Sequence, residues 1–319
     1  MEKFSIIIPV KPGGAVAALE ALKNVGFTQS DYEVVVAEGT RPSKQRNMAA
    51  SYATGDILYF IDDDSLLVSD ALERAEKHFQ DERVAVVGGP SLTPPLPDSS
   101  PFQLAIAAAF RSLVGGGGVR NRYRRYGKVR ETGDNELILC NLAFRKDLYI
   151  ALGGLDERLY PNEENELMDR LLKEGYKLIH DPDIYVSRGQ RPHWKAFVKQ
   201  MLSYGRGRAE QTLISHSVSL LSLVPMFFIL YLLFLTILPI WFALPLLFYF
   251  LIIGVTSLSV WYSSGFSVAW RFCLICPCMH VMYGAGMFLG FFAPRYKRKE
   301  RNIADVVNIK QIKKFGESI

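Results

Sequence analysis

Charged residues are missing from two long stretches near the end of this 319-residue chain. No Asp, Glu, Lys or Arg occurs over the 60 residues from Gln211 to Trp270, and a second uncharged run extends from Phe272 to Pro294. About 20 apolar residues cross the hydrocarbon core of a bilayer, so the first run is long enough for two crossings and the second for one. These runs exclude a purely soluble protein and predict an integral membrane protein.

Cysteine is also scarce: one of the four residues precedes the uncharged runs and three lie in the second run. This number and placement exclude a disulfide framework. The first residues, MEKFSIIIPVKPGG, contain an apolar stretch too short for the core of a signal peptide, and Lys11 follows it in place of a cleavage site. We therefore expect residues 1–210 to remain in the cytosol.

The net charge of +5 comes largely from two basic clusters, RNRYRRYGKVR at 120–130 and RYKRKER at 295–301. Nucleic acid attracts such clusters. These two accompany apolar segments, however, so anionic lipid head groups are the better partner. We expect membrane lipids and no nucleic acid among the partners.

Residues 1–210 alternate strand-like and helix-like segments, as βαβ units do. Strands are expected at 5–10, 32–37, 57–61 and 84–87, with helices between them at 15–24, 45–52 and from 69 or 70 to 79. This order predicts an α/β domain with a mostly parallel sheet between two layers of helices. Ligands of such sheets bind beyond the carboxyl ends of the strands.

Two further segments suggest contact with a membrane. Residues 91–135 combine a proline-rich connection, an amphipathic helix at 102–114 and the run GGGG at 115–118, which we expect to form a mobile, membrane-near loop; a disordered insertion is the alternative. Residues 193–210 predict an amphipathic helix on the membrane surface. The expected organisation is a cytosolic catalytic domain at 1–192, this interface helix, a transmembrane region at 211–294 and a basic tail at 295–319.

Three apolar segments are expected in the membrane region, at about 218–238, 240–262 and 272–293. Three full crossings would place the basic tail on the side opposite the catalytic domain, whereas the positive-inside rule favours the same side. Pro225, Pro245 and Pro277 each interrupt one segment, so one of the three segments can be re-entrant or interfacial. No Asp, Glu, Lys or Arg occurs within them, which argues against an ion pump or transporter.

Asp62, Asp63 and Asp64 stand side by side directly after the apolar strand DILYFI. Three like charges repel one another, so a positive group is expected beside them. Mg²⁺ and Mn²⁺ prefer oxygen ligands and usually take one or two from protein, with phosphates and water completing the shell. We expect Asp62 and Asp64 to hold such a cation on a diphosphate. An exposed acidic turn that caps the next helix is the alternative.

Several motifs in order make residues 4–210 resemble the family 2 glycosyltransferases, which have the GT-A fold and transfer sugar from a nucleotide diphosphate. SIIIPV is similar to the first strand of that family, and VVVAEGT stands where the family has two acidic residues and Gly-Ser. QRNMAASYATGDILYFIDDD resembles the run that ends in D-x-D. CNLAFRKDLYIALGGLDERLYPNEENEL resembles the acceptor-side segment that ends in a Glu-Asp pair.

The resemblance implies the following donor side. Asp64 carries the metal, Asp62 lies nearer the ribose or the metal shell, and Asp63 accompanies them. Glu38 resembles the carboxylate that contacts the base or ribose, although Ala37 precedes it where the family has a second acid. Pro9 and Arg46 complete the nucleotide side.

The Glu-Asp pair of the family appears here as Glu163-Glu164. The resemblance implies that Glu164 is the general base of a single displacement with inversion, with Glu163 as its rival. An acidic first helical turn that complements the helix dipole is the alternative. A sugar hydroxyl needs a general base whereas a polyprenyl phosphate is already an oxyanion, so a carboxylate here favours a lipid-linked saccharide as acceptor.

QMLSYGRGRA (200–209) resembles a juxtamembrane segment of the nonprocessive exopolysaccharide enzymes of the succinoglycan type. QRPHW (190–194) differs from the Q-x-x-R-W of processive synthases because His193 occupies the Arg position. A polyprenyl-phosphate glycosyltransferase similar to dolichol-phosphate-mannose synthase, and a nonenzymatic membrane scaffold, remain alternatives. Residues expected on the acceptor or lipid side are Asn141, Arg188, Arg191, Trp194, Arg206 and Arg208.

Overall fold

The computed structural model of the chain describes residues 2–26, 31–218, 220–297 and 306–319. These residues form two compact units. Unit 1 comprises residues 1–92, 121–188 and 300–319, and unit 2 comprises 93–120 and 189–299. Unit 1 therefore takes its last piece from the end of the chain, which the sequence suggested to be only a basic tail.

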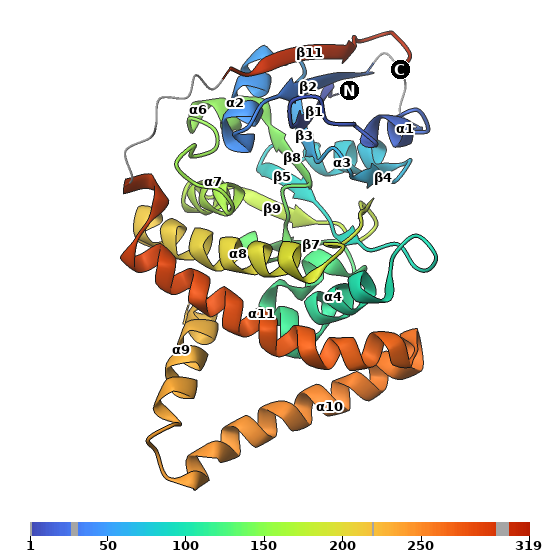
Figure 1. The fold of residues 1–319 in the computed structure, drawn as a ribbon. Helices are drawn as coiled ribbons and strands as arrows, with labels where there is room; N and C mark the ends of the chain where they lie inside the picture. The colour runs from blue at the N-terminus through green and yellow to red at the C-terminus, as the bar shows by residue number, and fades with distance from the viewer. Residues whose placement is uncertain (1, 27–30, 219, 298–305) are drawn as a thin grey trace. The chain divides into compact units, whose positions relative to one another are not determined.

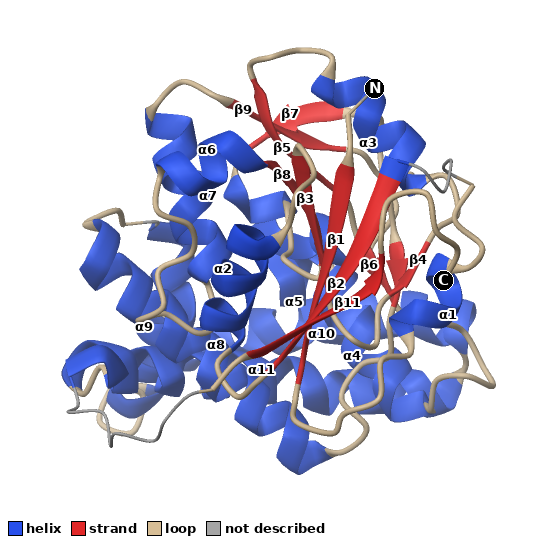
Figure 2. Ribbon diagram, turned by 90° about the horizontal axis from the view of Figure 1, so that it is seen from above, coloured by secondary structure: helices blue, strands red, loops and turns tan. Residues whose placement is uncertain are grey.

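Unit 1 is built on an eight-stranded sheet in the order β11-β2-β1-β3-β8-β5-β9-β7 (Figures 1 and 2). The strands β2, β1 and β3 are parallel, while β11, β8 and β7 run antiparallel to their neighbours. The sheet is thus mixed, where the sequence predicted a mostly parallel one: β1–β2, β1–β3 and β5–β9 are parallel pairs, and the other pairs of this sheet are antiparallel. Its strands are β1 Phe4–Val10, β2 Tyr32–Glu38, β3 Ile57–Ile61, β5 Val84–Gly88, β7 Arg130–Thr132, β8 Asn141–Arg145, β9 Lys177–His180 and β11 Asn308–Lys313.

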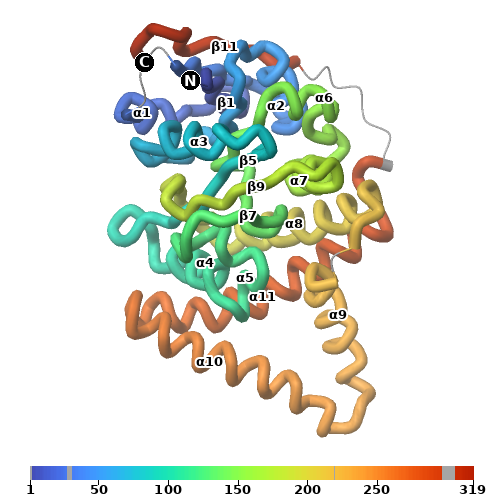
Figure 3. Tube along the Cα trace, turned by 180° about the vertical axis from the view of Figure 1, so that it is seen from behind, coloured from blue at the N-terminus to red at the C-terminus, as the bar shows by residue number. Residues whose placement is uncertain are grey.

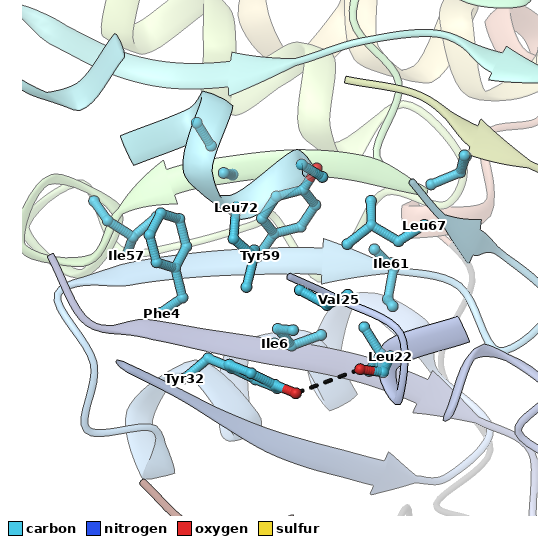
Figure 4. Packing of buried hydrophobic residues seen from close by; sticks show 14 of the residues in the cluster. Phe4, Ile6, Leu22, Val25, Tyr32, Ile57, Tyr59, Ile61, Leu67 and Leu72 are labelled. Atoms are coloured by element: carbon cyan, nitrogen blue, oxygen red, sulfur yellow. Dashed lines mark hydrogen bonds between the residues drawn. The ribbon is translucent and has the colours of Figure 1, made fainter. Parts of the chain in front are cut away.

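Helices cover both faces of this sheet, because its central strands are apolar on both sides. Helices α1 and α3 pack on one face, where the side chains of Phe4, Ile6, Tyr59 and Leu72 interlock (Figure 4). Helices α2, α6 and α7 pack on the other face. The bounds are α1 Ala18–Leu22, α2 Pro42–Tyr52, α3 Ala71–Phe79, α6 Lys146–Ala151 and α7 Glu163–Lys173.

A small three-stranded sheet in unit 1 has the order β4-β10-β6. Its strands are two residues long each: β4 Leu66–Leu67, β6 Ser91–Leu92 and β10 Val186–Ser187. Because β10 pairs with β4, the chain around Ser187 lies beside the chain that leaves the aspartate triplet.

Unit 2 is helical. Helix α4 (Pro101–Arg111) begins with a capping box between Ser100 and Gln103. The run GGGG, expected to be part of a mobile loop, is helical: α5 (Leu113–Gly116) includes its first half, and a 3₁₀ helix, Gly117–Tyr123, follows. The remaining helices are α8 Trp194–Ser215, α9 Leu220–Phe234, α10 Leu244–Ser264 and α11 Phe266–Phe292.

Two helical stretches in the described part of the chain, Ile240–Ser264 and Phe266–Phe292, are long and apolar enough to cross a membrane. Helix α9, the 15-residue core of the first expected segment, is shorter, and α11 begins six residues before the third expected segment. All three expected segments therefore form helices. Their packing, more than their length, indicates which of them cross the membrane.

Candidate active site

The carboxyl ends of β1, β2 and β3 form one edge of the sheet in unit 1. Val10 is paired with Glu38, so β1 and β2 end together, and β3 ends at Ile61, directly before the aspartates. Gln45 of α2 ties the first two strands by donating to the main-chain oxygens of Val10 at 2.9 Å and Ala37 at 2.6 Å. This edge is where the sequence predicted that a ligand would bind.

Two arginines supply the positive charge that the aspartate triplet was expected to need. Arg46 of α2 donates to Asp62 Oδ1 at 2.8 Å. Arg188 lies 2.8 Å from Asp62 Oδ2 and 2.6 Å from Asp64 Oδ1. Burial, together with the neighbouring carboxylates of Asp64 and Asp62, raises the pKa of Asp63. The triplet is therefore a compact anionic cluster held by cations from two distant parts of the chain.

The position of Arg188 follows from the small sheet. Ser187 of β10 is paired with Leu66 of β4, two residues after Asp64, so the next residue along the chain reaches the triplet. From the sequence, Arg188 was expected on the acceptor or lipid side. In the structure its guanidinium contacts both carboxylates that are expected to hold the cation.

The donor set fits a hard divalent cation. Asp62 and Asp64 both direct a carboxylate oxygen at the same guanidinium group, so both can reach one positive centre. No group of three or more His, Cys, Asp or Glu side chains with metal-binding spacing occurs among the described residues. A site of one or two protein carboxylates is the usual arrangement for Mg²⁺ or Mn²⁺ on a nucleotide diphosphate.

Arg46 connects the triplet to the acidic start of α7. Its Nη1 donates to Glu163 Oε1 at 3.2 Å while its Nη2 donates to Asp62. The Glu163 side chain is 2% exposed. Burial, and then the neighbouring Glu164, raise the pKa of Glu163 to about 8, although Arg46 acts in the opposite direction. The two acidic motifs are therefore joined through Arg46 into one cluster.

The other acidic residues of this turn differ in their surroundings. Glu166 forms an ion pair with Arg170 at 2.7 Å, one helical turn later, which accounts for it structurally. Glu164 is 7% exposed, and among the described residues its carboxylate accepts no hydrogen bond. Among the described glutamates of this turn, Glu164 is therefore the one whose carboxylate is not already hydrogen-bonded to an arginine.

Glu38 meets a residue that the sequence reasoning missed. Its Oε2 accepts a hydrogen bond from Lys310 of β11 at 2.7 Å, and its Oε1 accepts one from the amide of Gly13 at 3.2 Å. These bonds lower the pKa of Glu38. Pro9 lies in β1, paired with Ala37. The alternation of apolar and polar residues in NIKQIK was the only sequence signal for the strand that carries Lys310.

The remaining predicted residues lie elsewhere. Asn141 is fully buried beneath the edge, where it accepts from Tyr59 at 2.8 Å and donates to the main chain of Ile184 at 2.9 Å. In unit 2, the ring of Trp194 packs against Phe102. The other residues of this group in unit 2 are Arg191, which is exposed, Arg206, which is paired with Glu210 at 3.1 Å, and Arg208, which donates to Gln211 at 3.0 Å.

Comparisons with known proteins agree with this geometry. A sequence profile described as glycosyl transferase family group 2 matches residues 57–289. The succinoglycan biosynthesis protein ExoA from Rhizobium meliloti is 26% identical over 235 residues, which cover 65% of this chain and 69% of that protein.

Two solved structures match the chain to different degrees. The mannosyltransferase PcManGT from Pyrobaculum calidifontis, in complex with GDP-Man and Mn²⁺, is 13% identical with a TM-score of 0.55, over 91% of this chain and 87% of that one. S. aureus TarS 1-349 in complex with UDP-GlcNAc is 12% identical with a TM-score of 0.46, over 86% of this chain and 90% of that one. The family match and the first of these structures confirm the GT-A fold class predicted from the sequence.

Proposed function

Because the chain belongs to glycosyl transferase family group 2, we propose that it moves a sugar from a nucleotide diphosphate to a hydroxyl group of a lipid-linked saccharide during glycan or exopolysaccharide assembly. The observation that carries this proposal is the link from Asp62 through Arg46 to Glu163. It joins a carboxylate cluster suited to a cation on a diphosphate with the acidic start of α7. The relative of 26% identity is a succinoglycan biosynthesis protein, which supports an exopolysaccharide role.

Asp64 and Asp62 are proposed to hold the divalent cation, and Glu38 the base or ribose of the donor. A bound Mg²⁺ or Mn²⁺ would stabilise the negative charge of the leaving nucleotide diphosphate. Arg46 and Arg188 already neutralise these carboxylates in the structure. They are therefore placed to offer their guanidinium groups to phosphate oxygens as well.

Glu164 is proposed as the general base. The hydroxyl oxygen of the acceptor attacks the anomeric carbon, the bond from that carbon to the diphosphate oxygen breaks, and the proton of the hydroxyl passes to Glu164. The anomeric configuration inverts because a single displacement occurs. Glu163 is assigned to holding Arg46, since its carboxylate already accepts a hydrogen bond from that residue.

Replacing Glu164 tests both the mechanism and the acceptor class. We expect Glu164→Gln to lower transfer to a saccharide acceptor by ~10²–10⁴-fold, the usual range for loss of a general base, while affinity for the nucleotide sugar is kept. Glu164→Asp should retain part of the activity. Glu166→Gln is the matched control, because that residue is already paired with Arg170. Full activity of Glu164→Gln would favour a polyprenyl phosphate acceptor.

A nonenzymatic scaffold is the remaining alternative. Isothermal titration with a panel of nucleotide sugars and Mn²⁺ separates it from an enzyme, since a transferase has to bind its donor. Heat of binding for at least one donor, abolished by Asp64→Asn, is the expected result. No binding to any of them would favour the scaffold.

The reaction is proposed to occur on the cytoplasmic face of the membrane. The two basic clusters at 120–130 and 295–301 flank apolar helices, and such clusters are retained on the cytoplasmic side during insertion. Nucleotide sugars are charged and do not cross bilayers unaided, so a donor site on this face meets its substrate directly.

A further inference from the structure

The last strand of the chain restricts how the membrane region can be threaded. β11 is hydrogen-bonded antiparallel to β2, with Ile309 paired to Ala37, and Lys313 is fully buried in unit 1. Both ends of unit 1 therefore lie on one side of the membrane. Residues 295–301 read RYKRKER, and such a charged stretch does not cross hydrocarbon. The apolar helices between Ser215 and Arg295 must then make an even number of crossings.

Within unit 2, α11 is packed against α8 at backbone distance. A Cβ atom added to Gly205 of α8 would overlap the carbonyl oxygen of Tyr283, and one added to Gly286 of α11 would overlap the carbonyl oxygen of Leu202. Gly290 likewise fits against Arg206. From Gly286 on Leu202 to Gly290 on Arg206 the contacts advance along both helices in the same direction. Figures 1 and 3 show α8 and α11 running side by side.

Helix α8 is too polar to span a bilayer, because Lys195, Lys199, Arg206, Arg208 and Glu210 all lie within it. The cost of placing so many charges in hydrocarbon is prohibitive. A helix that lies alongside α8 over two turns cannot cross the membrane unless α8 crosses with it. Length and composition alone therefore make α11 a candidate span, but its packing places it at the membrane surface.

A hydrogen-bonded clamp joins the same ends of these two helices. Glu210 of α8 is 1% exposed and accepts from Arg206 at 3.1 Å and from the backbone amide of Arg295 at 2.6 Å, directly after α11. Arg206 also donates to the carbonyl of Ala293. The guanidinium side chain of Arg295 is 39% exposed, which suits water or lipid head groups rather than lipid tails and agrees with a surface position.

Helices α9 and α10 have the opposite character. No residue of α9 is buried, and α10 buries only Ile253 and Val260. The exposed surface of both is apolar almost all round, as lipid-facing spans require. In α11, by contrast, ten residues are buried, and Phe266, Trp270 and Leu274, spaced four residues apart, form an exposed apolar stripe. Leu289 and Phe292 are exposed near the end of the helix.

We infer that α9 and α10 are the two membrane crossings, and that α11 lies in the interface on the same side as α8 and unit 1, with its apolar stripe on the lipid. The turn between α9 and α10 is then the part of the chain exposed on the far side. This resolves the conflict between three apolar segments and a basic tail on the near side. Only the side of the membrane on which each helix end lies is inferred, and this does not depend on which donor or acceptor the enzyme uses.

Cysteine labelling in sealed vesicles tests this inference. In full-length protein with the four native cysteines replaced by alanine, single cysteines are introduced by Ser51→Cys in unit 1, Thr236→Cys between α9 and α10, Ser263→Cys before α11, and Ser318→Cys at the end. A membrane-impermeant maleimide is applied to intact and to permeabilised vesicles of known orientation. Ser51→Cys is the reference for the near side.

The expected result is that Ser263→Cys and Ser318→Cys react from the same side as Ser51→Cys, and Thr236→Cys only from the other side. If Ser263→Cys reacted from the same side as Thr236→Cys, α11 would have to cross the membrane, and the inference would be overturned. Reaction of Thr236→Cys from the near side, or its protection from both, would also overturn it. Should the cysteine-free background not accumulate, an epitope inserted at the same four positions of the native chain, detected before and after permeabilisation, gives the same readout.

Discussion

Lys310 donates a hydrogen bond to Glu38 at 2.7 Å although 272 positions separate them in the chain. The pairing of β11 with β2 brings them together, and the same strand is held by Gln311, which donates to Glu33 at 2.7 Å. Glu38, the carboxylate that the family resemblance assigns to the nucleotide, is thus oriented by a strand that follows the apolar helices in the sequence.

Lys310→Met is expected to weaken binding of the nucleotide sugar several-fold, because the Glu38 carboxylate loses its fixed orientation. The control is Lys314→Met, which removes an exposed lysine outside the pairing. Isothermal titration measures both. Equal donor affinity in the two variants would contradict a positioning role for Lys310.

The same variant has a pH signature in stability. Lys310 lowers the pKa of Glu38, so this pair stabilises the fold above the ordinary carboxyl pKa and loses its effect as the pH falls through the lowered pKa. At neutral pH the Tm of the wild-type protein should therefore be higher than that of Lys310→Met. In acid this difference in Tm should vanish.

Glu163 should make stability depend on pH in the opposite sense. Its pKa is raised to about 8 by burial and Glu164, so between its ordinary pKa and pH 8 the folded state holds a proton that the unfolded state has released. Its contribution to stability therefore falls as the pH rises, by on the order of a few kcal/mol across this window. Glu163→Gln stays neutral and lacks this slope. Thermal unfolding in EDTA at several pH values from 5 to 8 measures the Tm of both proteins. Plotted against pH, the two sets of Tm values should diverge, and parallel plots would refute the raised pKa.

Arg188→Met is expected to tighten binding of Mn²⁺ to the free enzyme. The guanidinium lies on both Asp62 and Asp64, so a cation that binds there is repelled by it. Removing one such charge at a partly exposed site is worth about 1–4 kcal/mol at contact distance, and we expect roughly a tenfold lower Kd. Calorimetry without donor measures this, with Arg83→Met as the control. Weaker binding would show that Arg188 supports the metal site instead.

Gly205→Ala should destabilise unit 2. The added Cβ overlaps the carbonyl oxygen of Tyr283, so α8 and α11 have to separate. Overpacking of this kind costs about 1–3 kcal/mol. Gly254→Ala is the matched control, because nothing lies within 4 Å of a Cβ at that glycine of α10. Thermal unfolding in detergent should show a lower Tm for the first variant and no loss for the second.

Much of the donor edge could be predicted because it depends on local sequence. The apolar run Ile57–Ile61 forms a buried strand, as expected, and the aspartates must then follow at its carboxyl end. The motif QRN places Gln45, Arg46 and Asn47 on one short helix. Gln45 and Arg46 reach the ends of the strands, whereas Asn47 binds Tyr149 and Leu155. The family match, over residues 57–289, includes this strand and the aspartates.

The role of each charged group was less predictable. Arg188 appeared to belong to the segment that leads towards the membrane, and only the pairing of β10 with β4 turns it onto Asp62 and Asp64. Arg206 is one of several basic residues near apolar helices, and only the structure shows that it forms an ion pair with Glu210. Ion pairs between distant segments have no local pattern, because either partner could remain in solvent.

The sequence by itself determined that this protein has an α/β domain with an acidic strand end and a long apolar region, since side-chain periodicity and the absence of charge act within a few residues of the chain. The tertiary structure alone decided which cations hold the acids, that the last strand completes the catalytic sheet, and that α11 is packed against a charged helix. Those outcomes depend on which surfaces fit together across hundreds of residues, and that fit is a property of packing rather than of local composition.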